Sequence, residues 1–272
     1  MATRRWVGTA GLAGSFADAA NWDPATIPVA NDEVYFDSGS EDLDLTLDQS
    51  AITLDILCIT EGFTGNIADG FKINATNFYE RGSEGEHYFE GTYTTAIINN
   101  SSPEADGVHL DGTITNLLLF KGNVTLEAAA TATTIQCGYA GNQVGDVDLT
   151  IEVGATVTTI WQNGGDITCG AAWTNLYLVA GSFTHTDTNA TNIYVFDGSF
   201  DYQAAGHTLT SAVIYGGRFD TTGQYEALTV TDLEMWPGSV VDLRNQSNTV
   251  VITNGVLKHG GRLLVEEGTN LT

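Results

Sequence analysis

The second half of the chain repeats one short pattern of apolar and polar positions around a glycine. An apolar residue lies five positions before the glycine, a polar residue directly after it, and an apolar residue two positions after it. Segments 174–184 and 191–201 are nearly identical copies. The repeat glycines are Gly122, Gly165, Gly181, Gly198, Gly217, Gly238 and Gly261. Such short repeats predict a solenoid, in which each coil buries its apolar face against its neighbours.

The alternation after each glycine predicts a half-buried strand, because successive side chains of a strand point to opposite faces. The inward residues are expected to be Val124, Ile167, Phe183, Phe200, Phe219, Val240 and Leu263. The outward residues are expected to be Asn123, Asp166, Ser182, Ser199, Arg218, Ser239 and Arg262. We therefore predict an all-β chain folded as a parallel β-solenoid (β-helix). Right-handed coils are expected, because parallel crossover connections take that hand.

The strand before each glycine has an unusual outer face. Positions four and two before the glycine should point outward, and many of them are aromatic. The predicted interface residues are Phe120, Trp161, Tyr177, Tyr194, Phe196, Tyr215 and Trp236. A solvated sheet face is normally polar, and a contiguous apolar patch usually marks an interaction surface. We rank self-association first, cover by loops from residues 81–110 second, and stacking on sugars third.

The pattern divides the chain into three regions. Residues 1–50 are predicted to form an N-terminal cap and docking segment, in which Trp6 and Trp22 cover the open end of the solenoid. Residues 51–112 are predicted to form irregular early coils with projecting loops, and residues 113–272 the regular β-solenoid. Alternating residues expected to face one core near the first boundary are Leu43, Leu45, Leu47, Ile52, Leu54 and Ile56.

Charge and composition narrow the functions. With 34 acidic and 9 basic residues, the net charge of −25 predicts no nucleic-acid partner and no anionic membrane surface. No apolar stretch has the length of a membrane span, and residues 1–30 lack a signal-type apolar segment, which favours synthesis in a cytoplasm. Cys58, Cys137 and Cys169 have no metal-ligand spacing and are expected to be buried free thiols. No metal or cofactor is expected.

Two carboxylates could do chemistry. Asp201 and Asp220 follow their glycines by three residues, so parallel coils would place them about 4.8 Å apart. Glycosidases need two carboxylates at roughly 5–10 Å. A solvated Thr/Asp ladder is the simpler interpretation. Asp242 lies one position further along its repeat without a clear partner, and His185 is expected at the surface. Because the sequence carries no nucleophile or phosphate-loop motif, we expect no enzyme.

The opening of the chain resembles a head segment found on β-helix proteins of bacteria and their viruses. The residues that carry the resemblance are Trp6-Val7-Gly8, Asn21-Trp22, Pro28, Asp32 and Val34-Tyr35-Phe36. Val7 departs from the family pattern, in which glycine follows tryptophan directly. The head occurs on secreted surface proteins and on phage structural proteins, and the missing signal segment favours the phage group.

The resemblance then implies a virion component of the capsid-decoration or head-fibre type, commonly a homotrimer, that binds the major capsid protein or another virion protein. One alternative is a carbohydrate-binding or carbohydrate-cleaving β-helix of the tailspike type, using Asp201, Asp220 and the aromatic face. Another is a bacterial surface adhesin. The aromatic face separates these hypotheses, because rings buried between subunits are unavailable to sugars.

Overall fold

The fold is that of a solenoid. The structure is a computed structural model of the chain. It describes residues 1–8, 16–38, 48–67, 69–83, 85–100, 107–138, 147–204, 206–222, 228–244 and 250–265. The chain is all-β, with 64% strand and 1% helix, and its parallel strands form a β-solenoid of about nine turns. The predicted fold class is confirmed, while the right-handed coiling and the cap stay predictions.

Contacts divide the chain into two compact units, Met1–Thr133 (unit 1) and Thr134–Thr272 (unit 2). Strand β8 (Thr131–Cys137) crosses the boundary. The strands of unit 1 are β1 (Thr3–Trp6), β2 (Trp22–Asp23), β3 (Glu33–Phe36), β4 (Asp48–Thr60), β5 (Lys72–Arg81), β6 (His87–Asn99) and β7 (Val108–Leu126). From β3 to β7, each strand pairs in parallel with the next. Register shifts interrupt the pairing of β4 with β5 between Gln49 and Thr53 and that of β6 with β7 between Ile98 and Asn99, and the division into three regions stays a prediction.

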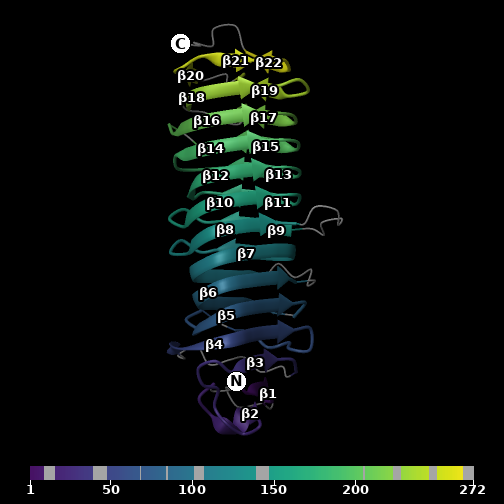
Figure 1. Ribbon diagram of the computed structural model, residues 1–272, viewed down its shortest axis with the longest axis vertical. Coiled ribbons are helices and arrows are strands. Elements are labelled where there is room, and N and C mark those ends of the chain that lie inside the picture. The colour runs from purple at the N-terminus through teal and green to yellow at the C-terminus, as the bar shows by residue number, and fades with distance from the viewer. Residues whose placement is uncertain are drawn as a thin grey trace. The chain divides into compact units, whose positions relative to one another are not determined.

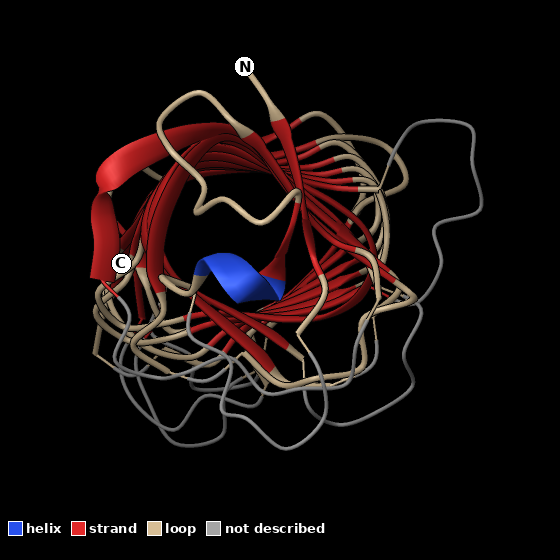
Figure 2. Cartoon of the chain, turned by 90° about the horizontal axis from the view of Figure 1, so that it is seen from below, coloured by secondary structure: helices blue, strands red, loops and turns tan. Residues whose placement is uncertain are grey.

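The N-terminal residues of unit 1 form an aromatic cluster. The rings of Trp6 and Trp22 meet edge to face at 5.2 Å, and Phe16 packs edge to face on Trp22 at 4.9 Å. The Trp22 indole N–H donates to the Phe16 carbonyl at 2.8 Å, so this buried donor is satisfied. The 3-10 helix η1 (Ala19–Asn21), blue in Figure 2, lies directly before Trp22. Such packing fits the predicted cap.

Strand β4 turns a corner, and the turn breaks the simple alternation. Leu54 and Leu57 are buried, whereas Asp55 and Ile56 between them are both half-buried. Two successive outward residues shift the inward phase by one, so Ile56 does not face the core as predicted. Ile52 is also only half-buried, and only Leu54 of the three fulfils the prediction. The predicted positions Leu43, Leu45 and Leu47 lie outside the described residues.

Unit 2 is built from two parallel series of strands. The bounds are β9 (Val147–Ile151), β10 (Thr156–Gln162), β11 (Asp166–Cys169), β12 (Ala172–Leu178), β13 (Ser182–His185), β14 (Ala190–Val195), β15 (Ser199–Tyr202), β16 (Thr208–Ile214), β17 (Arg218–Asp220), β18 (Leu228–Met235), β19 (Val240–Asp242), β20 (Val250–Ile252), β21 (Val256–Lys258) and β22 (Arg262–Leu264). Figure 1 shows β10, β12, β14, β16 and β18 one above another. Strands β11, β13, β15, β17 and β19 form the second series.

The repeat glycine joins the two series where consecutive turns approach closely. Gly198 has φ of 85°, and a Cβ added to it would lie 2.4 Å from the Gly181 carbonyl oxygen. A side chain would therefore suffer both backbone strain and a clash with the preceding turn. This explains why glycine recurs once per coil and why its spacing reveals the repeat.

The inward column after the glycine is confirmed through most of unit 2. Phe183, Phe200 and Phe219 lie in register and are fully buried, and neighbouring rings stack with centroids 5.5 Å apart. The prediction was wrong after Gly238. Val241, not Val240, pairs with Phe219, because this turn has one more residue between the glycine and the strand.

Ser239 was also predicted to face outward, and it is buried. The additional residue after Gly238 changes the direction of the Ser239 side chain. The Ser239 hydroxyl donates to the Trp236 carbonyl at 2.7 Å. The prediction for the cysteines is confirmed: Cys58, Cys137 and Cys169 are buried free thiols. Burial raises the pKa of Cys137 to about 12, so the thiol stays protonated.

Candidate functional site

Strands β10, β12, β14 and β16 of unit 2 contain no Asp, Glu, Lys, Arg or His, although the chain has 34 acidic and 9 basic residues. We call their outward surface the neutral sheet. Its outward side chains are mainly threonine, asparagine and aromatic residues. The second series of the same unit differs, because Asp166, Asp201 and Asp220 point outward from it. The neutral sheet therefore has no charged side chains, whereas the outward side of the second series carries carboxylates.

The first column of predicted interface residues lies on the neutral sheet. Trp161, Tyr177 and Tyr194 occupy one register position in successive turns. The Trp161 and Tyr177 rings stack at 3.9 Å with planes 9° apart, and the Tyr177 and Tyr194 rings stack at 4.9 Å with planes 8° apart. Trp161 remains 40% exposed. The structure thus brings these three residues together as predicted.

A second column lies just beyond the ends of the same strand series. Phe196 and Tyr215 stack at 5.0 Å, and Tyr215 and Trp236 stack at 5.8 Å. Trp236 in turn stacks on His259 at 4.2 Å. Phe196 is 44% and Tyr215 40% exposed. The predicted residues of unit 2 therefore form two parallel columns, which we call together the aromatic columns.

Phe120 is the predicted interface residue that lies in unit 1, on β7, and it is 36% exposed. It takes part in no ring stacking among the described residues. The loop-cover alternative draws on residues 81–110. Most of that range is strand, in β6 and the start of β7, and residues 101–106 lie outside the described part. The interface assignment and the loop cover both stay predictions.

Stacking within the aromatic columns determines what their exposed surface can bind. Rings stacked one turn above another cover each other's faces and leave their edges exposed. A sugar binds an aromatic ring through the face, where its C–H bonds meet the π system. Edges arranged in a regular row are instead suited to packing against another apolar or polar protein surface. This geometry favours a protein partner over a sugar along most of each column.

The carboxylates of the second series form a ladder, because they lie in register in successive turns, and arginine side chains lie beside them. Asp201, Asp220 and Asp242 lie in register, which confirms the predicted adjacency of the first two. Asp242 does have partners, contrary to the prediction. Its carboxylate accepts from Arg218 at 2.8 Å and from Arg244 at 2.6 Å. The hydrogen bonds from Arg244 hold the pKa of Asp242 below its usual range.

Asp201 belongs to the same ladder, but its environment differs from that of Asp242. One of its carboxylate oxygens is buried without a hydrogen-bond partner, and Gln203 donates to the other at 2.6 Å. Burial, with the Asp220 charge as a smaller contribution, raises the pKa of Asp201. Asp201 is therefore not the fully solvated ladder residue that was expected. The arginines beside Asp220 and Asp242 identify this ladder first as an ion-pair cluster.

His185 was predicted at the surface, and it is buried. The residue before it, Thr184, is in register with Asp201, and alternation turns His185 itself inward. Its ring lies 5.6 Å from Trp173 and 5.4 Å from Tyr202. Burial lowers its pKa despite the nearby carbonyl of Thr188. His185 is thus a core residue and does not work with Asp201.

A buried polar cluster in unit 1 contains the residue types of a hydrolase triad. Glu80, Ser83 and His87 are all buried. The Ser83 hydroxyl donates to Glu80 and lies 3.2 Å from His87 Nδ1, and Glu80 lies 3.4 Å from the same nitrogen. A triad needs the serine and the acid on opposite ring nitrogens. Here Nε2 faces the Gly65 carbonyl at 3.1 Å, so the cluster is structural.

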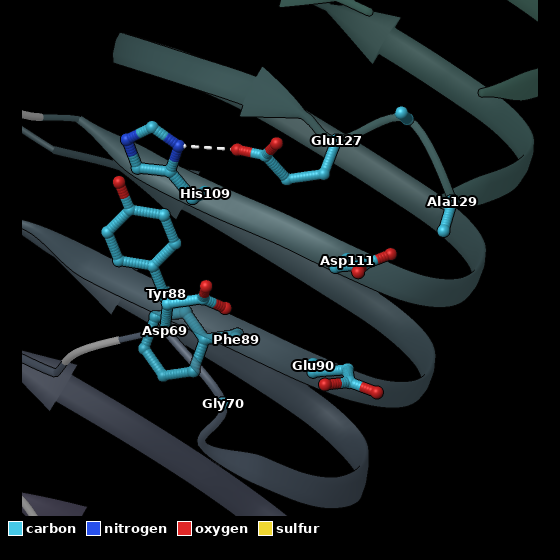
Figure 3. Close-up of a pocket in the computed structure, with 10 residues that line it drawn as sticks. Asp69, Gly70, Tyr88, Phe89, Glu90, His109, Asp111, Glu127 and Ala129 are labelled. Carbon is cyan, nitrogen blue, oxygen red and sulfur yellow. Dashed lines mark hydrogen bonds and ion pairs between the residues drawn. The ribbon is translucent and has the colours of Figure 1, made fainter. Parts of the chain in front are cut away.

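Unit 1 also contains a pocket of about 260 Å³ that the sequence analysis missed (Figure 3). It is lined by Asp69, Gly70, Tyr88, Phe89, Glu90, His109, Asp111, Glu127, Ala128 and Ala129. The rings of Tyr88 and His109 stack at 4.0 Å with planes 15° apart. His109 Nδ1 lies 2.7 Å from Glu127, and the Tyr88 hydroxyl donates to Glu86 at 2.8 Å. That hydrogen bond raises the pKa of Tyr88 to about 12.

The carboxylates of this pocket are concentrated by the register of β6 and β7. Glu90 pairs with Asp111, and Lys72 on β5 pairs in register with Glu90 and forms an ion pair with it. Burial and then the Glu90 charge raise the pKa of Asp111. The segments 88–91 and 109–112 each contain a ring-bearing residue, an apolar residue, an acid and glycine in that order, but this likeness alone does not place them in register.

Among the described residues, no group of three or more His, Cys, Asp or Glu is placed so that it could hold a metal ion. In the same part of the chain, no helix has the length and apolar character needed to cross a membrane. No protein-family model, curated protein or solved structure matches this chain.

Proposed function

We propose that the protein is a non-enzymatic structural component of a virion, of the capsid-decoration or head-fibre type, that self-associates through its neutral sheet. The observation that carries the proposal is the neutral sheet itself: four successive strands without a charged residue, in a chain of net charge −25. The second copy would pack against the aromatic columns. A closed homo-oligomer is expected, with a trimer as its form.

The electrostatics favour this surface for self-association. Two chains of charge −25 repel each other, so association must place their carboxylates apart. The cores of protein interfaces are depleted of charge and enriched in aromatic residues. Both properties coincide on β10, β12 and β14, and the uncharged β16 continues the surface. Asp232 and Glu234 on the neighbouring β18 would then lie at the rim, where water still solvates them.

The virion assignment has a separate support, the head segment around Trp6, Trp22 and Asp32. Asp32 accepts hydrogen bonds from the Ala2 and Val29 backbone amides, and Arg4 pairs with it at 3.2 Å. These contacts lower the pKa of Asp32 against the effect of burial, and they join Asp32 to the start of β1 and to the residues before β3. We propose that this segment docks on the major capsid protein or another virion protein.

A charge-insertion experiment tests self-association. Tyr194→Asp with Phe196→Asp places two carboxylates in the aromatic columns. Thr150→Asp with Thr168→Asp is the matched control, because both threonines are exposed and neighbour each other on β9 and β11. Molar mass is measured by light scattering at moderate salt, and far-ultraviolet circular dichroism checks the fold. The parent and the control should be oligomers, and the first variant a folded monomer.

Two outcomes would reject the proposal. A parent that is monomeric at high concentration has no self-associating surface. Equal dissociation of both double variants would show that total charge, rather than the neutral sheet, governs assembly.

A further inference from the structure

The pocket of unit 1 combines three features in one hollow. Its apolar part comprises Ala128 and Ala129, and the stacked rings of Tyr88 and His109 line another part. The carboxylates are Asp69, Glu90, Asp111 and Glu127. In Figure 3, Glu90 and Asp111 lie on neighbouring strands to one side of the aromatic pair. The ligand must therefore present an apolar portion and a group that carboxylates bind.

The carboxylates are only partly neutralised by the protein. Lys72 pairs with Glu90, and His109 lies between Glu127 at 2.7 Å and Glu86 at 3.6 Å. Asp111 forms no ion pair among the described residues, and its hydrogen bond comes from the Gly112 backbone. The pocket thus confines negative charges close together, and Lys72 forms its ion pair with Glu90 rather than with Asp111.

The excess of carboxylates over cations in the pocket favours a cationic ligand over a neutral one. A neutral ligand, such as a sugar, would displace water from the carboxylates and increase their mutual repulsion. A cation would relieve that repulsion while it donates hydrogen bonds, and charge-assisted hydrogen bonds are the stronger kind. The volume of about 260 Å³ is slightly below that of typical ligand pockets, about 300–1,000 Å³, and suits a single side chain or small amine.

We propose that this pocket binds an alkylammonium group, with the ammonium among Asp69, Glu90 and Asp111 and the aliphatic stem against Tyr88 and the two alanines. The ammonium belongs either to a lysine side chain of a partner protein or to a free polyamine. This inference is independent of the proposed self-association, because the pocket lies in unit 1 and the neutral sheet in unit 2.

The primary test titrates the full chain with n-butylamine, at a pH where it is protonated, and with n-butanol as the neutral analogue at the same ionic strength. The side-chain NMR signals of Tyr88 and His109 report occupancy. Saturable shifts with n-butylamine, and none with n-butanol, are expected. Equal shifts with both compounds would overturn the proposal, as would no shift with either. Shifts with methyl glucoside but not with the amine would identify a carbohydrate site instead and would also overturn it.

Two variants should change the affinity in opposite directions. Asp111→Asn removes the carboxylate without a cation and should weaken amine binding by roughly five- to tenfold. Lys72→Met removes the competing internal cation and should strengthen it by roughly threefold. Asp166→Asn removes one exposed charge in unit 2 and should leave affinity unchanged. If Asp166→Asn weakens binding as much as Asp111→Asn, the amine is part of a diffuse counter-ion cloud and the proposal fails.

The same titration distinguishes the two sources of the ammonium. Spermidine is compared with a Gly-Lys-Gly peptide, and Gly-norleucine-Gly serves as the uncharged control peptide. Tighter binding of the lysine peptide supports a protein partner, whereas tighter binding of spermidine supports a free polyamine. Failure of both charged probes, in a protein whose circular dichroism is unchanged, would contradict the proposal. Molar mass measured alongside should not change in Asp111→Asn.

Discussion

The outward residues of β5, β6 and β7 in unit 1 include Lys72, Glu90 and Asp111, whereas those of β10, β12, β14 and β16 in unit 2 include no charged residue. Inside, the two regions are alike. In both regions, apolar side chains at equivalent inward positions of successive turns form buried columns, and the strands pair in parallel. The solenoid therefore needs only its inward residues, and its outward residues are available for different tasks in different turns.

The comparison also separates two uses of aromatic rings. Tyr88 and His109 stack beside carboxylates and line a pocket. Trp161 and Tyr177 stack as closely, but on a surface without charges. Stacking itself follows from parallel register, because identical positions in successive turns lie about 4.8 Å apart. The charges around the two stacked pairs differ, and this difference favours a small-ligand site in one case and an extended protein contact in the other.

The largest expected effect breaks the inner column. Phe200→Ala should lower the free energy of unfolding by about 3–5 kcal/mol, because Phe200 is fully buried between Phe183 and Phe219. Chemical denaturation measures the loss. Ser199→Ala, one residue away and half-buried, should change stability by no more than about 0.5 kcal/mol. Equal losses at both positions would mean that the register is wrong.

A smaller effect sharpens the contrast within the carboxylate ladder. Asp242→Asn should destabilise the fold by about 1–3 kcal/mol, because two arginines lose a buried anionic partner. Asp201→Asn should be neutral or stabilising, by no more than about 1 kcal/mol, because folding disfavours the charged form of Asp201. Denaturation at pH 7 compares them. Destabilisation of the same size in both would contradict the assigned difference.

The contributions of Asp242 and Asp201 to stability should depend on pH in opposite directions, because their pKa values are shifted in opposite directions. The lowered pKa of Asp242 gives stability that is present above the ordinary value of 3.8 and is lost as pH falls below it. The raised pKa of Asp201 gives a contribution that is present below 3.8 and is lost as pH rises through the folded-state value. Subtracting each variant's profile from that of the parent should reveal slopes of opposite sign.

The buried His185 predicts a further pH effect, smaller than the loss of Phe200. Its pKa is lowered from 6.5 by burial, so the unfolded chain binds more protons once the pH falls below that value. Stability should therefore decrease as pH falls from 6.5 toward the folded-state pKa, and should be level above 6.5 for this group. His185→Gln should remove this part of the profile. An unchanged slope in the variant would show that other groups cause it.

Sequence reasoning succeeded where local alternation is sufficient. The glycine repeat placed Phe183, Phe200 and Phe219 correctly, because each position depends only on a few neighbouring residues. It failed at Ile56, where a corner puts two successive residues outside, and at Val240, where one additional residue shifts the phase. Alternation alone carries no information about corners or insertions, so both errors have the same physical origin.

The sites were harder to predict than the fold. The aromatic columns were found because each ring sits at a fixed distance from its repeat glycine, as Tyr177 and Tyr194 do. The pocket depends on the pairing of Glu90 with Asp111 and on Asp69 from a separate segment, and such long-range register is not written in any local pattern. His185 was misplaced for a simpler reason: histidine suits either environment, and only its phase in the strand decides.

The central claim is that the neutral sheet is buried between copies of the chain. Hydroxyl-radical footprinting of the parent oligomer, compared with the Tyr194→Asp, Phe196→Asp variant, tests it most directly. Oxidation of Trp161 and Tyr215, each 40% exposed in the single chain, should decrease in the oligomer, while Met1, 82% exposed, should react equally in both. Phe120 would report whether unit 1 joins the contact. An oligomer in which Trp161 and Tyr215 react as fully as in the variant would contradict the claim.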